Sequence, residues 1–63
     1  MNGKLETITS DNEVQFDEMV NTFLAKVLNP VITFNSTPVL RNGDVITMFI
    51  AHITYIDFLE NIQ

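Results

Sequence analysis

The sequence has no cysteine and only one histidine, His52, among its 63 residues. The lack of cysteine excludes disulfides and thiolate-bound metal sites. A single imidazole does not build a zinc site without help from carboxylates. We therefore expect no metal and no cofactor. Absence of cysteine is also typical of proteins in a reducing compartment, so we expect a cytoplasmic location.

Basic residues are scarce as well. Lys4, Lys26 and Arg41 stand against eight acidic residues, and the net charge is −5. Proteins that bind a nucleic-acid backbone need several lysines or arginines to neutralise phosphates, and attraction to anionic lipid needs them too. We therefore expect neither nucleic acid nor a membrane as a partner.

Long apolar runs are also missing. The longest, residues 45–56, is interrupted by Thr47, His52 and Thr54 and is too short to span a bilayer as a helix. Residues 1–9 lack the apolar segment of a secretory signal. These features predict a soluble protein.

Glycine is limited to Gly3 and Gly43, which leaves no glycine-rich phosphate loop. The chain also has no G-x-S-x-G element and no metal-ligand spacing. Acidic residues gather at 11–18, but paired carboxylates need a desolvated cleft to work as acid and base, and a helix start offers none. We predict that the protein is not an enzyme.

What the chain does contain is one clear amphipathic helix over residues 10–29. Ser10 and Glu13 match a capping box, and Asn29 precedes Pro30, which should end the helix. Its apolar stripe at helical spacing comprises Phe16, Met19, Val20, Phe23, Leu24 and Val27. This stripe predicts packing of one helix face on a sheet.

Three strands are predicted, at residues 4–9, 31–37 and 45–58. Asn42-Gly43 is a strong hairpin signal because a type I′ turn needs positive φ at both central positions. The predicted fold is thus a single α+β domain over residues 1–63. Its order is β-α-β-β, with one amphipathic helix packed on an antiparallel sheet and the last two strands paired as a hairpin. The tail at 57–63 favours a final helical turn over a frayed end.

The turn also predicts the hairpin register. Arg41 should face Asp44 as a hydrogen-bonded pair, which places Pro38 opposite Thr47 at a non-hydrogen-bonded site. The missing amide hydrogen of Pro38 then points outward, which marks this strand as an edge or as bent.

Residues 45–58 are apolar on both faces, unlike a strand with one solvated side. The helix should cover the face that carries Phe49 and Ile53, which leaves the other face in need of cover. Subunit contact is the simplest cover. The expected oligomer interface consists of Val39, Ile46, Met48, Ile50 and Ile56.

Two sets of polar residues are candidates for binding. Asp17 and Glu18 on the exposed helix surface would dock a basic protein partner. His52, Thr33, Asn35 and Arg41 would contact a small molecule between subunits. Each set also fits ordinary solvated surface, and His52 fits a hydrogen-bonded interface residue.

Three segments carry a resemblance to a known family: QFDEMVNTFLAKV at 15–27, VITFNST at 31–37 and VITMFIAHITY at 45–55. Together they resemble small acidic sporulation proteins of spore-forming bacteria and related short phage proteins. The turn at 38–44 and the tail depart from that family. The resemblance implies the fold and a Gram-positive bacterial or phage origin, and it carries no activity.

These observations favour a non-enzymatic, homo-oligomeric binding protein that regulates or inhibits a protein partner. Such a protein could be phage-encoded and act on a host defence system in the cytoplasm of an infected cell. The alternatives are a protein that sequesters a small molecule or nucleotide between subunits, and a structural unit of a larger assembly.

Overall fold

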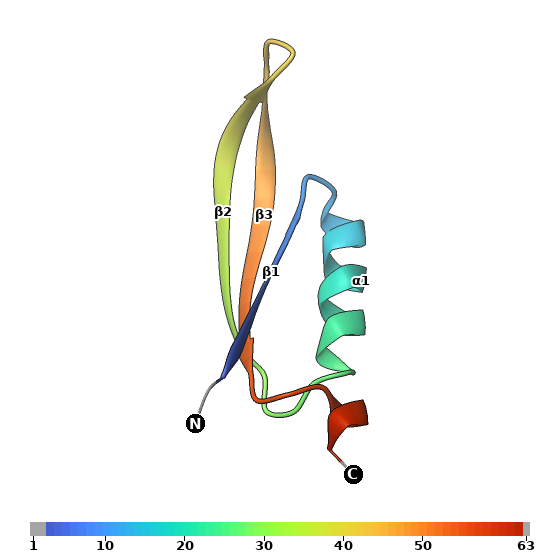
Figure 1. Cartoon of the computed structure of the whole chain (residues 1–63). Helices are drawn as coiled ribbons and strands as arrows, with labels where there is room; N and C mark the ends of the chain where they lie inside the picture. Colours follow the sequence, from blue (N-terminus) through green and yellow to red (C-terminus); the bar gives the residue numbers. More distant parts are fainter. Residues whose placement is uncertain (1–2, 63) are drawn as a thin grey trace.

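The computed structural model describes residues 3–62, which form one α-helix, a three-stranded sheet and a short 3-10 helix (Figure 1). The elements are β1 (Lys4–Ser10), α1 (Glu13–Leu24), β2 (Val31–Arg41), β3 (Asp44–Tyr55) and the short 3-10 helix η1 (Leu59–Asn61). The predicted α+β class, the β-α-β-β order and the hairpin of the last two strands are confirmed. The final turn in the tail is also present, as η1.

The sheet has the strand order β1-β3-β2, and both pairings are antiparallel. The strand that is apolar on both faces, β3, is therefore the central one. Its backbone edges are covered by neighbours on both sides, and α1 lies against one of its faces (Figure 1). We call that face the helix side of the sheet and the opposite one the open face.

The hairpin has the register that the turn predicts. Arg41 pairs with Asp44, and Pro38 pairs with Thr47. Asn42 and Gly43 have φ values of 52° and 84°, as a type I′ turn requires. β2 continues through Pro38 to Arg41, farther than its predicted end at residue 37. It can do so because β2 is an edge strand whose proline needs no amide partner on its outer side.

The start of α1 differs from the predicted capping box. Asn12 is the N-cap, and its side chain accepts a 2.9 Å hydrogen bond from the amide of Gln15. Ser10 is instead the last residue of β1 and pairs with Phe49. The predicted capping box was wrong because Ser10 belongs to β1, and residues 11 and 12 form the turn that joins β1 to α1.

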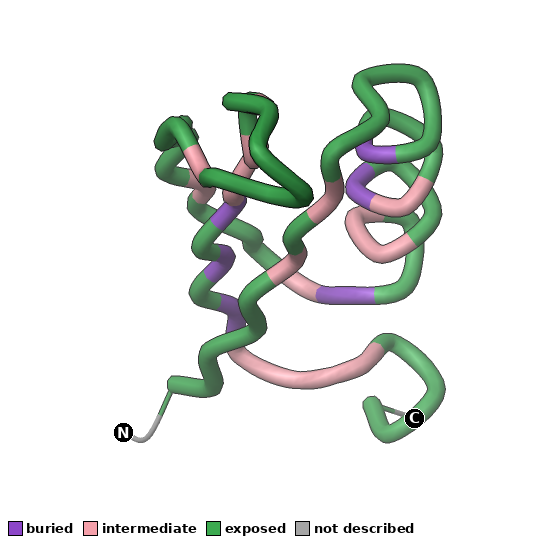
Figure 2. The backbone as a smooth tube through the Cα atoms, turned by 90° about the horizontal axis from the view of Figure 1, so that it is seen from above, coloured by how far each residue is buried: buried purple, intermediate pink, exposed green. Residues whose placement is uncertain are grey.

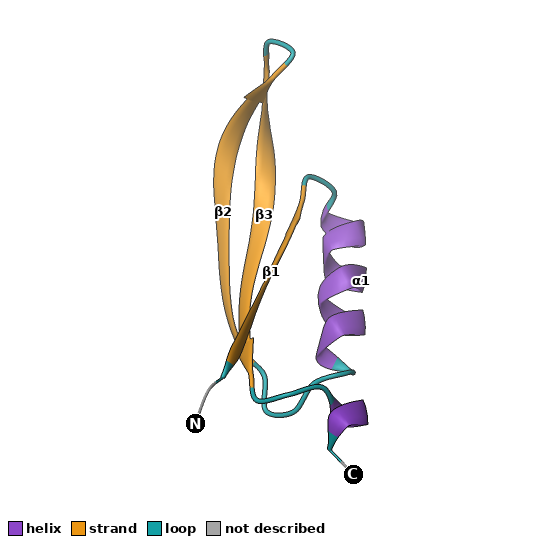
Figure 3. Ribbon diagram, in the orientation of Figure 1, coloured by secondary structure: helices purple, strands orange, loops and turns teal. Residues whose placement is uncertain are grey.

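The end of α1 also lies earlier than Asn29. The helix stops at Leu24, and the loop that follows pairs with the C-terminal segment through a bridge between Val27 and Phe58. Leu28 donates its amide to the Asp57 carbonyl, 2.9 Å away. Figure 3 shows these two loops side by side below the end of α1, above η1. The helix ends early because these tertiary hydrogen bonds replace helical ones.

The core lies between α1 and the lower half of β3. Ala51, Ile53 and Tyr55 are buried on the helix side of β3, where Phe16 and Val20 of α1 meet them. In Figure 2 the buried segments lie on β3, on α1 and in the loop after α1. The expected packing of the helix stripe on this face is therefore confirmed for this half of the sheet.

Beyond the core, the hairpin extends as an arm of two strands. β1 ends where Ser10 pairs with Phe49, so in the described part of the chain no third strand lies beside residues 37–48. Figure 1 shows this arm rising past the top of α1. Leu40 and Val45 lie on its helix side and are 72% and 73% exposed. The expectation that the helix covers this whole face was wrong, because a helix of 12 residues is shorter than the hairpin.

Asp57 ties the C-terminal segment to β1. Its Oδ1 accepts hydrogen bonds from Lys4 Nζ at 3.0 Å, from the Phe58 amide at 2.8 Å and from Asn61 Nδ2 at 3.2 Å. These donors, Lys4 first, stabilise the carboxylate and hold the pKa of Asp57 below its ordinary value.

We expect Asp57→Asn to lower the melting temperature at pH 7 by a few degrees at most, since the site is exposed. Because the pKa of Asp57 is lower in the folded state, its carboxylate stabilises the fold at pH values above the unfolded-state pKa of about 3.9. This stabilisation is lost as the pH falls through the folded-state pKa. The difference in melting temperature between the wild type and Asp57→Asn should therefore be smaller at pH 2 than at pH 7. Glu60→Gln, which removes a carboxylate from the same segment but no hydrogen bond to Asp57, is the control and should melt close to wild type at pH 7.

Candidate functional site

His52 lies in a polar row that crosses all three strands of the open face. It is paired with Thr33 on β2, as the register predicts, and with Thr7 on β1. Thr7 Oγ1 and His52 Nδ1 are 3.2 Å apart and share a hydrogen bond. Thr7 was missed by sequence reasoning because the sequence does not show which edge of the sheet β1 occupies. All three side chains are exposed.

The other two residues of the expected small-molecule set do not join this row. Asn35 turns its Oδ1 back onto the amide of Ser36, 2.9 Å away. Arg41 lies at the tip of the hairpin, where Nη1 forms an ion pair with Asp11 Oδ2 at 2.8 Å. Its strand partner Asp44 is eight residues from His52 (52 − 44), or about 27 Å along a strand. Within one chain, the four residues therefore do not converge on one ligand.

The acidic pair lies where the sequence places it, on the solvent side of α1. Asp17 and Glu18 are both exposed. The chain's other charged groups are partly used within the fold, since Arg41 pairs with Asp11 and Lys4 with Asp57. Both ion pairs are exposed and contribute little to stability.

The expected interface residues divide into two groups. Val39, Ile46, Met48 and Ile50 follow one another along the open face, and each is half-buried. Ile56 lies beyond the end of β3, where its amide donates to the Leu28 carbonyl at 3.1 Å, so it does not belong to the sheet face. More exposed apolar side chains on the open face lie lower, at Leu5 (62%) and Val31 (65%).

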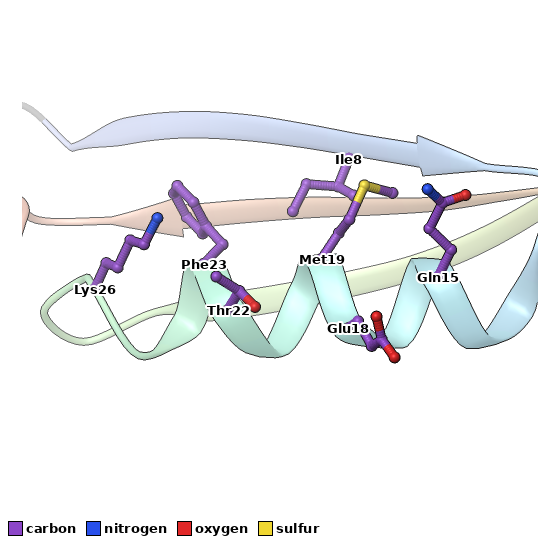
Figure 4. Close-up of a pocket in the computed structure, with 7 residues that line it drawn as sticks. All are labelled: Ile8, Gln15, Glu18, Met19, Thr22, Phe23 and Lys26. Carbon is purple, nitrogen blue, oxygen red and sulfur yellow. The ribbon is translucent and has the colours of Figure 1, made fainter.

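A groove of about 460 Å³ runs between β1 and α1 (Figure 4). Figure 4 shows Ile8 of β1 and Met19 of α1 pointing toward each other across it. The full lining is Ile8, Gln15, Glu18, Met19, Thr22, Phe23 and Lys26. Met19 was expected in the core stripe, but it is only half-buried because it faces this groove. The groove was missed because the place of β1 was unknown.

Comparison with known proteins adds no relative: no family model, curated protein or solved structure matches this chain. Within residues 3–62, no three histidine or carboxylate side chains are grouped as a metal ion would require. In the described part of the chain, no helix is both long and apolar enough to cross a bilayer.

Proposed function

We propose that this chain is a non-enzymatic, self-associating protein that regulates or inhibits a protein partner. The observation that supports this most is the hairpin arm. Residues 31–40 and 45–55 contain no Asp, Glu, Lys or Arg, although the whole chain carries a net charge of −5. The charged residues of the hairpin, Arg41 and Asp44, lie at its turn beside Leu40 and Val45, and an exposed apolar surface with a polar rim is typical of a protein contact.

The shape of the molecule supports the same proposal. Its Cα radius of gyration is 13.9 Å, whereas a compact domain of this length has about 11 Å. Its accessible surface is 4626 Å², against roughly 4,100 Å² for a monomer of its mass. An extended domain with surplus surface gains stability when a second protein covers part of that surface.

The positions of the candidate polar residues support a binding role over a catalytic one. His52 lies on an open, exposed face, where its one side-chain hydrogen bond among residues 3–62 is to Thr7, and Arg41 is far from it at the hairpin tip. General acid–base work depends on groups held together in a water-poor site. The resemblance to small sporulation and phage proteins is compatible with an inhibitor of a host defence system acting in the cytoplasm.

The test has two parts. Light scattering at micromolar concentration should give a mass above 7.2 kDa, and a strictly monomeric protein would contradict self-association. Immobilised wild type should then capture a partner from a Gram-positive lysate that Leu40→Asp/Val45→Asp captures at least about tenfold less, because a buried aspartate costs more than 1.4 kcal/mol.

The matched control is Asp17→Asn/Glu18→Gln, which removes two exposed charges from α1. If this control loses the captured protein and the arm variant keeps it, the acidic helix surface and not the arm is the partner surface. Both variants change exposed side chains, so each should melt close to wild type.

A further inference from the structure

The helix is displaced toward one edge of the sheet. α1 approaches β1 most closely and β3 less, and its backbone stays farther from β2. β1 is an edge strand, so the helix face with Gln15 and Met19, extended by Lys26 just after the helix, lies over the groove at that edge (Figure 4). A fourth strand beside β1 would lie under this helix face and fill the groove.

The outer edge of β1 is open to such a strand. Because Arg41 and Asp44 form the hydrogen-bonded pair at the turn, alternate residues of β3 direct their amides to β2 and to β1 in turn. Ala51 and Ile53 then bond to Ile8 and Glu6. The amides and carbonyls of Leu5, Thr7 and Thr9 consequently point outward.

The outer edge of β2 is open over only part of its length. By the same alternation its outward groups belong to Ile32, Phe34, Ser36, Pro38 and Leu40. The Ser36 amide is already bonded to Asn35, and Pro38 has no amide hydrogen. The usable edge near the base is therefore residues 31–35, whose one aromatic residue, Phe34, is 62% exposed on the helix side.

We infer that residues 31–35 of β2 pair in parallel with β1 of a second copy, beneath the α1 of that copy, so that copies join head to tail. This inference rests on the self-association in the proposed function, and it identifies the two surfaces through which copies would associate. It also moves the contact from the open face, where the sequence placed it, to the two edges of the sheet.

The register between β2 and the β1 of the second copy follows from which backbone amides and carbonyls point outward on each strand. In a parallel pair, an outward residue bonds to the two neighbours of the residue it faces. Phe34 therefore faces Ile8 of the second copy and bonds to its Thr7 and Thr9. Both side chains then lie on the helix side, with Phe34 in the groove near Met19.

The same register covers exposed apolar residues on the open face. It places Val31 opposite Leu5 of the second copy, and these two are the most exposed large apolar residues at the base of that face. A shift of two residues that set Phe34 opposite Glu6 would place Val31 opposite Gly3 and Thr33 opposite Leu5, so the two exposed apolar side chains would no longer cover each other. Residues 31–35, the part of β2 in this contact, carry no charge, so they add no electrostatic repulsion between two acidic chains.

The simplest alternative is a twofold pairing of β1 with β1. It would place the two copies of α1 on the same side of the sheet, over neighbouring β1 strands about 4.8 Å apart, so both helices would compete for the space above the groove, because packed helices need 8–10 Å between axes. Head-to-tail addition separates successive helices by three strand spacings, about 14 Å. A heterologous contact of this kind builds closed rings or open filaments.

The experiment uses engineered cysteines, since the natural chain has none. Leu5 and Val31 both pair with Thr54, so within one chain they are two strand spacings apart, about 10 Å, too far for a disulfide. Leu5→Cys/Val31→Cys oxidised with glutathione disulfide should therefore give a ladder of dimers, trimers and larger species on a non-reducing gel.

The matched control is Leu5→Cys/Asn35→Cys, in which the second cysteine lies four residues, about 13 Å, out of register. It should cross-link at least tenfold more slowly. Equal rates for the two pairs, or equally fast dimers from Leu5→Cys alone, would overturn the inference.

Thr7→Pro gives a second, independent test by removing an outward amide of β1 while the bonds to β3 remain. It should lower the mass measured by light scattering, whereas Thr7→Ala, which loses the same hydroxyl, should not. An oligomer that survives Thr7→Pro would refute the edge contact and leave the proposed self-association intact. A wild type that is monomeric at every concentration would refute both.

Discussion

Ile53→Ala is expected to remove most of the stability of this fold. Ile53 is fully buried at the centre of the sheet, and truncating such a residue costs about 2–5 kcal/mol through lost transfer energy and the cavity that remains. A domain of this length has roughly 3–9 kcal/mol in total. The variant should therefore be largely unfolded, or nearly so, at 25 °C.

Urea denaturation followed by circular dichroism measures this effect. Ile53→Val, which removes one methylene from the same site, should cost only about 0.5–1.5 kcal/mol. Thr54→Ala, at the exposed neighbouring position on the open face, should change stability by less than about 0.5 kcal/mol. A cost for Ile53→Ala as small as that of Thr54→Ala would show that α1 does not pack on β3 as described.

The hairpin could be predicted closely because its determinants are local. Asn42-Gly43 sets the turn, and the alternation of hydrogen-bonded pairs then determines every partner up to Val31 and Thr54. Pro38 agrees with that register because its position lacks an inward amide. Local chemistry of this kind does not depend on how the rest of the chain packs.

The ends of α1 could not be predicted, because tertiary contacts determine them. Residues 25–29 have ordinary helical sequence up to Asn29, but Lys26 and Leu28 bond to the segment at 57–59. Nothing in the local pattern announces a partner thirty residues away. The same reason explains the wrong assignment of Ile56 to the sheet, since its amide belongs to this loop pairing.

The place of β1 was the largest omission, and the candidate surfaces depend on it. With β1 beside β3, His52 gains Thr7, Met19 becomes part of a groove, and Leu5 joins Val31 on one face. Because β1 and β2 flank β3 on both sides, less of the apolar surface of residues 45–55 has to be covered by another protein than the sequence suggests. The most exposed large apolar side chains belong to β1, β2, the arm and the start of α1.

Phe16→Ala is the second change with a large expected effect. Phe16 is buried and joins α1 to both hairpin strands, with its ring centroid 5.8 Å from that of Phe49 and 6.3 Å from that of Phe34. Truncating a buried phenylalanine costs about 3–5 kcal/mol. Because this ring links α1 to both hairpin strands, the variant should lose helix and sheet signals together in a urea titration.

Phe34→Ala is the informative counterpart, since it removes the other ring of the same contact from an exposed position. In an isolated chain it should cost less than about 1 kcal/mol. If Phe34 lies in the groove of a second copy, the cost rises with protein concentration, because assembly stabilises the fold by mass action. Urea midpoints at 1 μM and 100 μM separate the two cases: the gap between Phe34→Ala and wild type should widen with concentration. A gap that stays constant would mean that Phe34 stabilises only its own chain.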